Sequence, residues 1–464
     1  MAAVGGQVRE RAVGWRGVLA DTRPLADPHF RRLWLASIVT VIGAQLTVVA
    51  VPAQIYSITG SSAYVGLAGV FGLVPLVVFG LWGGALADAM DRRTLLIGST
   101  VGLIGTSAAF WLQAMLGNRD VWLLLVLFSV QQAFYAINSP TRSAVLPRLL
   151  DAELLPAANS LSMTIYQAGA IAGPLVGGAL IPLLGFSWLY LLDTVSLFTT
   201  LGAVVALPRL PVEGLAGAPG LRSVIDGLAY LRGHPILLMS FLVDIIAMVF
   251  GMPRALFPEL AHLSFGGPDE GGLAFALLFA AIPAGAVLGG VFSGWVSRVS
   301  RQGYAVVVAI LAWGLAMTGF GLAAGAAGGS GGLWLAVAVL MLVAGGAADM
   351  ASAAFRVSML QSAATDEVRG RLQGIFIVVV AGGPRIADVA HGGAAALVGT
   401  AAAAAGGGVL VVVLTVAAAL AVPTFVRYRS CAEIPHLDRY PRLPGAAPTL
   451  SFRPLGQSCG DSFA

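Results

Sequence analysis

The sequence predicts an all-α membrane protein whose twelve transmembrane helices form two six-helix bundles. Three observations lead to this prediction: the composition, the number of long apolar runs, and a polar linker halfway along the chain. Of the 464 residues, 58% are hydrophobic and only 10% are charged, whereas a soluble domain carries about 25% charged residues. The same composition excludes a disordered chain, because disordered chains are poor in apolar residues and rich in charge.

The apolar runs give the order of the expected helices. A helix needs about 20 apolar residues to cross the hydrocarbon core of a bilayer. The first six predicted spans lie near 33–58, 64–87, 94–117, 121–146, 157–184 and 187–207, and the second six near 236–261, 272–296, 303–326, 333–357, 371–397 and 405–427. Gly and Pro interrupt the fifth and the eleventh. The chain therefore divides into a leader (1–32), a first bundle (33–207), a linker (208–234), a second bundle (235–427) and a tail (428–464).

The three segments outside the bundles are polar. Residues 1–32 are basic, and the apolar run that follows is too long for a cleavable signal peptide. The linker is rich in Pro and Gly at first, whereas 221–232 has the amphipathic spacing of a helix on the inner membrane face. The tail has no apolar run and is expected to be mostly disordered.

Arginine residues predict the orientation. With the N-terminus inside, most of the arginines between spans fall on inner loops: Arg92, Arg93, Arg142, Arg148, Arg209, Arg222, Arg232, Arg298, Arg301, Arg356, Arg369 and Arg371. Only Arg119 and Arg254 fall on the outer side. This bias predicts a cell-membrane protein with both termini in the cytoplasm. It also accounts for the sequence pI of about 9.3 without a nucleic-acid partner.

Two six-helix halves around a polar linker form an internal repeat, and in such proteins substrate sites usually lie at mid-membrane between the repeats. The architecture therefore favours a transporter over a channel or an intramembrane enzyme. The expected partners are a small-molecule substrate, protons and the lipid bilayer, and the chain is expected to act as a monomer. No cofactor or metal is expected, since Cys431 and Cys459 both lie in the tail and form no ligand pattern.

The loop between the second and third spans reads GALADAMDRR from Gly84 to Arg93. It resembles the signature loop of the major facilitator superfamily, whose pattern is G-x-L-A-D-R-x-G-R-R. Gly84, Asp88, Arg92 and Arg93 match, whereas Ala89 stands where the pattern has Arg. The resemblance implies a cytoplasmic gate that latches the two halves. The alternative is a basic loop that only sets the topology.

The fifth span contains GAIAGPLVGG, which is a complete G-x-x-x-G-P-x-x-G-G pattern. It resembles the antiporter motif of exporters in the same superfamily. Its members are Gly169, Gly173, Pro174, Gly177 and Gly178. Glycines every four residues make a flat face for close helix packing, and a proline removes one backbone hydrogen bond and bends the helix. We expect a bendable helix at the interface between the halves, and simple small-residue packing is the alternative.

Other short stretches resemble the enterobactin-exporter-like branch of the superfamily. They are Val51–Ile55, Ala281–Ala286, Met359–Gln361 and Arg369–Gly374. The resemblance covers all twelve spans and implies export of a siderophore or a drug-like compound. The Arg that drug antiporters carry in the fourth span is absent, so proton coupling through that residue cannot be carried over.

Ionisable residues inside the spans are the candidates for function, because each costs at least about 2.5–3.5 kcal/mol to insert. In the eleventh span, Arg385, Asp388 and His391 follow one another at intervals of three and are expected near one face. Pro384 is expected to unwind this helix locally. We expect Arg385 to bind anionic or phenolic oxygens, Asp388 to take and release a proton, and His391 to relay it. A structural ion pair between Arg385 and Asp388 is the alternative.

Three further acids lie in predicted spans. Asp244 in the seventh span and Asp349 in the tenth are candidates for proton coupling, and each is as well explained by a structural role. Asp193 in the sixth span is expected to cap an interface near the outer surface. The aromatic residues Phe71, Phe79, Tyr135 and Tyr166 either line a cavity or pack in the core.

These patterns lead to one main hypothesis, which is proton-coupled export of a small amphipathic molecule by alternating access. A proton-coupled importer is the alternative within the same class. A non-transporting membrane sensor is the alternative from another class. The sequence has no nucleotide-binding or hydrolase motif, so we do not expect an enzyme.

Overall fold

The computed structural model of the chain describes residues 21–208, 231, 233–363 and 366–429. Of residues 81–89, 297, 361–363 and 366–381 it describes the backbone alone. Every regular element in these ranges is a helix. The leader up to residue 20, all but one residue of the predicted linker helix, and the tail from 430 lie outside the described residues.

The first half contains five long helices: α1 (Pro28–Thr59), α2 (Ser62–Ala89), α3 (Arg92–Met115), α4 (Val121–Leu149) and α5 (Leu155–Val205), with short 3₁₀ turns η2 (Arg23–Ala26) and η3 (Ala152–Leu154) before α1 and α5. The helix α5 covers two predicted spans. It breaks at Gly185, whose φ of 76° is readily adopted only by glycine, and the predicted boundary between spans five and six lies at this residue.

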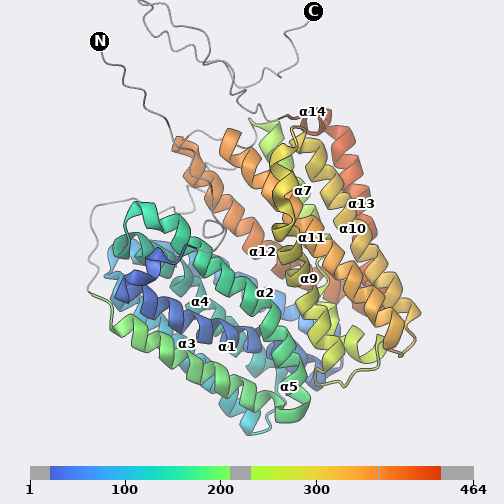
Figure 1. The fold of residues 1–464 in the computed structure, drawn as a ribbon. Coiled ribbons are helices and arrows are strands. Elements are labelled where there is room, and N and C mark those ends of the chain that lie inside the picture. The colour runs from blue at the N-terminus through green and yellow to red at the C-terminus, as the bar shows by residue number, and fades with distance from the viewer. Residues whose placement is uncertain (1–20, 209–230, 232, 364–365, 430–464) are drawn as a thin grey trace, which may run out of the picture.

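The second half begins with α7 (Pro235–Gly251), which is followed by the short segments η4 (Arg254–Leu256), α8 (Phe257–Glu259) and η5 (Leu260–Ser264). Its remaining helices are α9 (Leu273–Val291), η6 (Ser293–Arg298), α10 (Gln302–Ala326), α11 (Gly332–Ala363), α12 (Asp366–Val398), α13 (Thr400–Ala421) and α14 (Pro423–Val426). Figure 1 shows the two halves as separate groups of helices, with α12 extending from the second group toward the first.

Ten helical segments of the described chain are long and apolar enough to cross a membrane. One of the ten, Ala152–Val205, contains the break at Gly185 and so covers two predicted spans. The charged helix α12 is not among them. The ten segments therefore agree with twelve crossings only when α12 and both parts of α5 are included.

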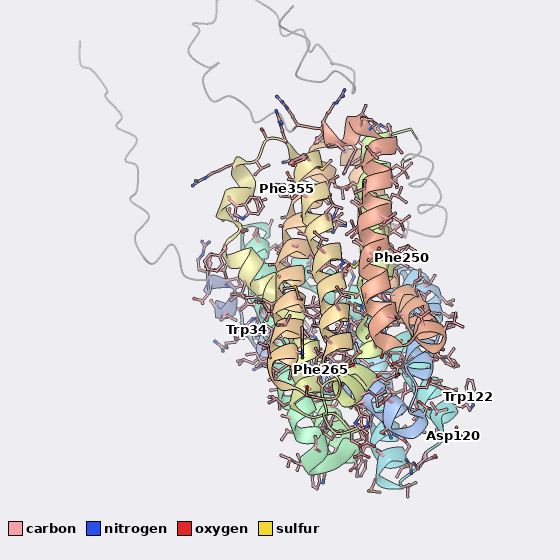
Figure 2. All side chains as sticks on the ribbon, turned by 90° about the vertical axis from the view of Figure 1, so that its right-hand side faces the viewer. Trp34, Asp120, Trp122, Phe250, Phe265 and Phe355 are labelled. Carbon is pink, nitrogen blue, oxygen red and sulfur yellow. The ribbon has the colours of Figure 1, made fainter. Side chains whose placement is uncertain are left out.

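The helix ends follow from local capping. The Asp27 side chain accepts a hydrogen bond from the Phe30 backbone N–H at 2.7 Å, so α1 begins at Pro28 rather than near residue 33. Asp120 caps α4 in the same way beside the exposed Trp122, and Figure 2 shows both residues at the periphery of the molecule. The helix α13 begins at Thr400, earlier than predicted.

Two expectations about broken helices are wrong in opposite ways. The helix α12 runs without interruption through Pro384, so the predicted local unwinding does not occur. The seventh span, in contrast, leaves the α-helix after Gly251 and continues through Met252 and Pro253 into the 3₁₀ turn that starts at Arg254. Pro253 lacks the backbone donor that would continue α7, which explains the break at this place.

Most of the glycine pattern in α5 packs inside the first half. A Cβ atom added at Gly169 or Gly173 would overlap Val41 or Gln45 of α1, and one at Gly177 would lie 3.1 Å from Leu46. Gly178 alone faces the second half, where an added Cβ would lie 2.7 Å from the Ala276 Cβ of α9. The helix continues through Pro174. The expected interface between the halves therefore begins only at the last glycine of the motif.

The two halves touch at the end of the bundle where α1 stops and α2 starts, which we call the distal end. Three glycines of α2 (Gly66, Gly69 and Gly72) lie against Asp388, Arg385 and Gly392 of α12. Their spacing at every third residue puts them on one face and lets the two backbones approach closely. The glycine face of α2 is therefore the main contact of the first half with α12.

Hydrogen bonds reinforce the same end. The Gly272 backbone N–H donates to the Gly178 carbonyl at 2.8 Å, and the Ser62 N–H donates to the Glu259 carboxylate at 2.9 Å. The rings of Tyr56 and His262 lie 6.2 Å apart across the same boundary. Contacts from three helices of the first half (α1, α2 and α5) thus converge on the distal end.

Replacement of Gly173 by Leu tests the packing inside the first half. The added side chain would overlap Gln45, and overpacking of this kind costs about 1–3 kcal/mol. We expect Gly173→Leu to lower the melting temperature of the detergent-purified protein by several degrees. Gly202→Leu is the matched control on the same helix, since no atom lies within 4 Å of a Cβ there. Equal melting temperatures for the two variants would contradict the packing described here.

Candidate charge clusters within and between the two halves

A buried ion pair joins α7 and α11 in the second half. The Arg356 guanidinium contacts the Asp244 carboxylate, and the two side chains are only 5% and 1% exposed. The Asp349 carboxylate lies 3.9 Å from the other Arg356 nitrogen and is 24% exposed. These three residues, which we call the acid–arginine triad, hold two acids and one base. Both acids belong to the predicted site, and the structure brings them together through Arg356.

Arg356 was predicted to lie on an inner loop, and that prediction is wrong. The helix α11 continues to Ala363, beyond the predicted end near 357, so the arginine is inside the bundle. Asp349, Ser352 and Arg356 follow at intervals of three and four, which places them on one stripe of the helix. An arginine side chain tilts toward the N-terminus of its helix and so reaches back along this stripe toward Asp349. The stripe was visible in the sequence and could have identified Arg356.

A second cluster of charges lies where the halves meet. The Arg385 guanidinium stacks over the Phe128 ring of α4, with its carbon 5.2 Å from the ring centroid. Asp388 lies one turn further along α12, against Gly69 of α2. Arg254 and Arg385 are the two cations that act on the Asp388 carboxylate, and Arg254 also lies over the Phe279 ring at 5.9 Å. We call Arg254, Arg385 and Asp388 the interface cluster.

The sequence placed Arg254 near the outer end of the seventh span, and its role in this cluster was missed. After the break of α7 at Pro253, η4 starts at Arg254, whose partly buried side chain acts electrostatically on Asp388 of α12. No spacing rule connects residue 254 with residue 388, because they come from different helices. Only the fold brings these residues together.

His391 does not share the surroundings of Arg385 and Asp388. Its side chain is 4% exposed, and one ring nitrogen lies 3.1 Å from the Phe250 carbonyl of α7. The ring also fills the space above Gly407 of α13. The expectation that all three residues of α12 lie near one face is therefore wrong for His391, which contacts its own half, whereas the other two face α2 and α4.

Two half-exposed tyrosines of the first half lie near the interface cluster. Tyr135 of α4 is 49% exposed and Tyr166 of α5 is 51% exposed. Arg385, Arg142 and Tyr166 are the groups that act electrostatically on the Tyr135 hydroxyl. Arg142 was predicted on an inner loop, but it lies within α4 and donates a hydrogen bond to the Ser37 hydroxyl of α1. Together these residues form a polar surface on the first half that faces Arg385.

Asp193 has a different place from the one predicted. Instead of capping an interface near the surface, it is 2% exposed and accepts hydrogen bonds from Thr47 at 2.7 Å and Ser107 at 2.9 Å. Further along the same helices, the amides of Gln54 and Gln113 donate to each other, and the Tyr190 hydroxyl donates to Gln54. This chain of polar contacts ties α1, α3 and α5 together inside the first half.

The predicted cytoplasmic gate is described only in part. The side chains of Gly84 and Asp88 lie outside the described residues. Arg92 donates to the Ala144 carbonyl at 3.0 Å and Arg93 to the Val205 carbonyl at 2.6 Å, and both partners belong to the first half. The role of these four residues as a latch remains a prediction.

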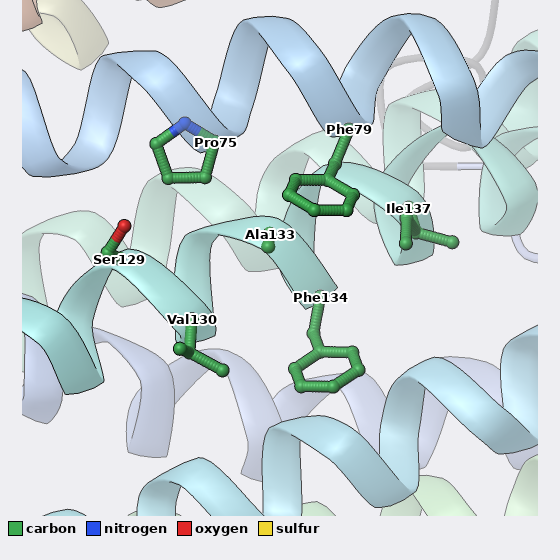
Figure 3. A pocket seen from close by; sticks show the side chains of 7 residues that line it. All are labelled: Pro75, Phe79, Ser129, Val130, Ala133, Phe134 and Ile137. Carbon is green, nitrogen blue, oxygen red and sulfur yellow. The ribbon is translucent and has the colours of Figure 1, made fainter.

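An apolar groove of about 250 Å³ lies between α2 and α4. Figure 3 shows Pro75 and Phe79 on one side of it and Ser129, Val130, Ala133, Phe134 and Ile137 on the other. No charged side chain lines it. Phe79 is therefore a groove residue, whereas Phe71 packs near the Trp122 ring, with 6.4 Å between the centroids.

A double-mutant cycle tests the buried pair of the triad. Removing one partner of a buried ion pair leaves an uncompensated charge and costs about 3–5 kcal/mol, whereas replacing both is often neutral. We expect Arg356→Leu to lower the melting temperature and Asp244→Asn with Arg356→Leu to restore most of the loss. Additive losses in the double variant would contradict the pairing.

Comparison with known proteins places this geometry in a family. The profile of the transmembrane secretion effector family, which belongs to the major facilitator superfamily, matches residues 20–442. Enterobactin exporters of Shigella boydii serotype 18 and Escherichia coli O81 are each 28% identical over 371 residues, which cover 79% of this chain and 85% of the exporter.

Solved transporters share the fold. A nucleoside transporter superposes with a TM-score of 0.69 at 12% identity, over 84% of this chain and 99% of that chain. A bacterial homologue of the iron transporter ferroportin, in an inward-facing state, gives 0.63 at 15% identity, over 86% and 98%. The fold is thus that of the major facilitator transporters, and nothing in the family indicates an enzyme. The chain is a multi-pass membrane protein and belongs to the transmembrane secretion effector family of that superfamily.

Proposed function

We propose that the protein exports a small amphipathic molecule across the cell membrane in exchange for protons, by alternating access. The observation that carries this proposal is the way the halves meet: close glycine packing and a few polar contacts join them at the distal end. Two compact bundles can separate at such a contact as rigid bodies, because a packed interface switches between a few discrete arrangements rather than deforming continuously. The relatives named enterobactin exporters support export as the direction and a siderophore as the cargo.

The orientation follows from the arginines. If both termini are cytoplasmic, the distal end faces outward, and the contacts described above close the outer side of the protein. The conformation would then be inward-facing. Arg92 and Arg93, with their carbonyl partners in the first half, would be available to form cytoplasmic contacts in the opposite state.

Arg385 is the residue we propose for substrate binding. Its guanidinium lies over Phe128 and near the Tyr135 hydroxyl, so an aromatic surface and a cation from opposite halves face the same place. Guanidinium groups bind carboxylate and phenolate oxygens with paired hydrogen bonds, and they stack on aromatic faces. A ligand held between Arg385 and the first half would weaken the direct contact between the halves and so favour its opening.

Enterobactin transport into inverted membrane vesicles tests the site. Loss of a charge-assisted hydrogen bond costs about 1.5–3 kcal/mol, so Arg385→Gln should reduce the rate at low substrate by about tenfold or more. Arg385→Lys should recover little, since lysine lacks the planar group that stacks on Phe128. Arg119→Gln, an exposed arginine at the distal end, serves as the matched control. Wild-type rates in Arg385→Gln would refute the assignment.

The same vesicles test the direction and the alternatives. Export with proton exchange predicts accumulation in inverted vesicles that have an acidic interior, and collapse of that accumulation when a protonophore is added. Accumulation in right-side-out vesicles instead would favour a proton-coupled importer. The absence of any transport with several siderophores and drug-like compounds would favour the sensor hypothesis.

A further inference from the structure

We propose that Asp349 is the group that binds the transported proton, and that the buried Asp244–Arg356 pair positions it. This inference rests on the proposed function, because it names the coupling residue of that transporter. It departs from the expectation that Asp388 carries the proton. The argument depends on how many charges of each sign surround each acid.

The acid–arginine triad holds one negative charge more than it can balance. Arg356 and Asp244 contact each other directly and are both almost completely buried, so together they are neutral. Asp349 is 3.9 Å from the same guanidinium, so two carboxylates share one positive charge. In a medium of low dielectric an unbalanced charge is costly, and a carboxylate responds by taking up a proton. A proton on Asp349 makes the triad neutral.

Asp388 stands in the opposite situation. The two guanidinium groups of Arg254 and Arg385 act on this one carboxylate, so the interface cluster holds an excess of one positive charge. A proton on Asp388 would raise that excess to two. By charge count alone, a proton is therefore favoured less on Asp388 than on Asp349.

The exposure of the two acids in the triad separates their roles. Asp244 is 1% exposed, whereas Asp349 is 24% exposed and is the acid we propose to exchange protons with water. Asp349 is thus the most exposed member of the triad.

In the described ion pairs, the triad residues contact no charged side chain outside the triad. The helix α11 itself supplies Arg356 and the Ser352 hydroxyl, and α7 supplies Asp244. The helices α9 and α10 pack on α11 through apolar contacts of Gly289 with Ala347 and of Gly319 with Met341. Among these described side chains, Arg356 is the one cation, and it is shared between two acids.

The proton cycle that follows is simple. Asp349 takes a proton from the side to which the protein is open, which leaves Arg356 fully engaged with Asp244. Loss of the proton on the opposite side restores the second carboxylate near Arg356 and draws the guanidinium between the two acids. Each transport cycle would carry one proton through this site, and Arg356 acts as a positioning residue that contacts neither substrate nor proton.

Infrared difference spectroscopy of the full-length protein in liposomes tests the assignment without any substrate. A protonated carboxyl group gives a carbonyl band that disappears when the acid ionises. We expect a titrating band of this kind in the wild type that is lost in Asp349→Asn and retained in Asp388→Asn. Asp349→Glu should keep the band at a shifted frequency. Asp349→Asn leaves the Asp244–Arg356 pair intact, so it should fold.

A transport measurement with enterobactin then separates proton coupling from the movement of the two halves. In Asp349→Asn, enterobactin accumulation driven by a pH gradient should fall at least tenfold. Exchange of enterobactin between equal concentrations on the two sides should stay within about twofold of the wild type. Retention of the band in Asp349→Asn, or loss of both transport activities, would overturn the proposal. No transport by the wild type with an intact titrating band would instead count against the proposed function alone.

Discussion

The hydrocarbon core of the membrane requires every charge to be compensated nearby, and the arrangement of the second half follows from this constraint. Six of its ionisable residues form two groups, the triad and the interface cluster. Neither group balances: one has an extra acid and the other an extra base. An unbalanced group is costly in a bilayer, and it persists in proteins where a ligand or proton supplies the missing charge. The imbalance is what connects this fold to transport.

The first half solves the same problem without ion pairs. Its one described buried acid, Asp193, is held by hydroxyl groups, and paired amides and hydroxyls join α1, α3 and α5. Together with the glycines of α5 that lie against α1, these contacts make the first half a compact body. The second half, across the interface, supplies the two charge clusters. This arrangement allows the charged clusters of the second half to bind ligands while the first half provides aromatic surface and a fixed boundary.

Composition and periodicity predicted the fold class, the two halves and most helix boundaries, because crossing a bilayer leaves a long apolar run in the sequence. They were less successful with residues whose role depends on contacts between helices. Arg356 was assigned to a loop because the apolar run stopped near it, although the helix continues. Arg254 entered its cluster through a break at Pro253 that no hydropathy pattern marks. The opposite error occurred at Pro384, where neighbouring helices α2, α7 and α13 hold α12 in one piece.

Distances between the two halves test the central claim most directly. Spin labels at Asn118 and Ser330 would report the distal end, and labels at Asp151 and Ser300 would report the opposite end; all four residues are exposed. In liposomes, acidification with enterobactin present should lengthen the first distance and shorten the second as the halves rock about their contact. Distances that stay constant while transport proceeds, or that change together in the same direction, would contradict alternating access in this protein.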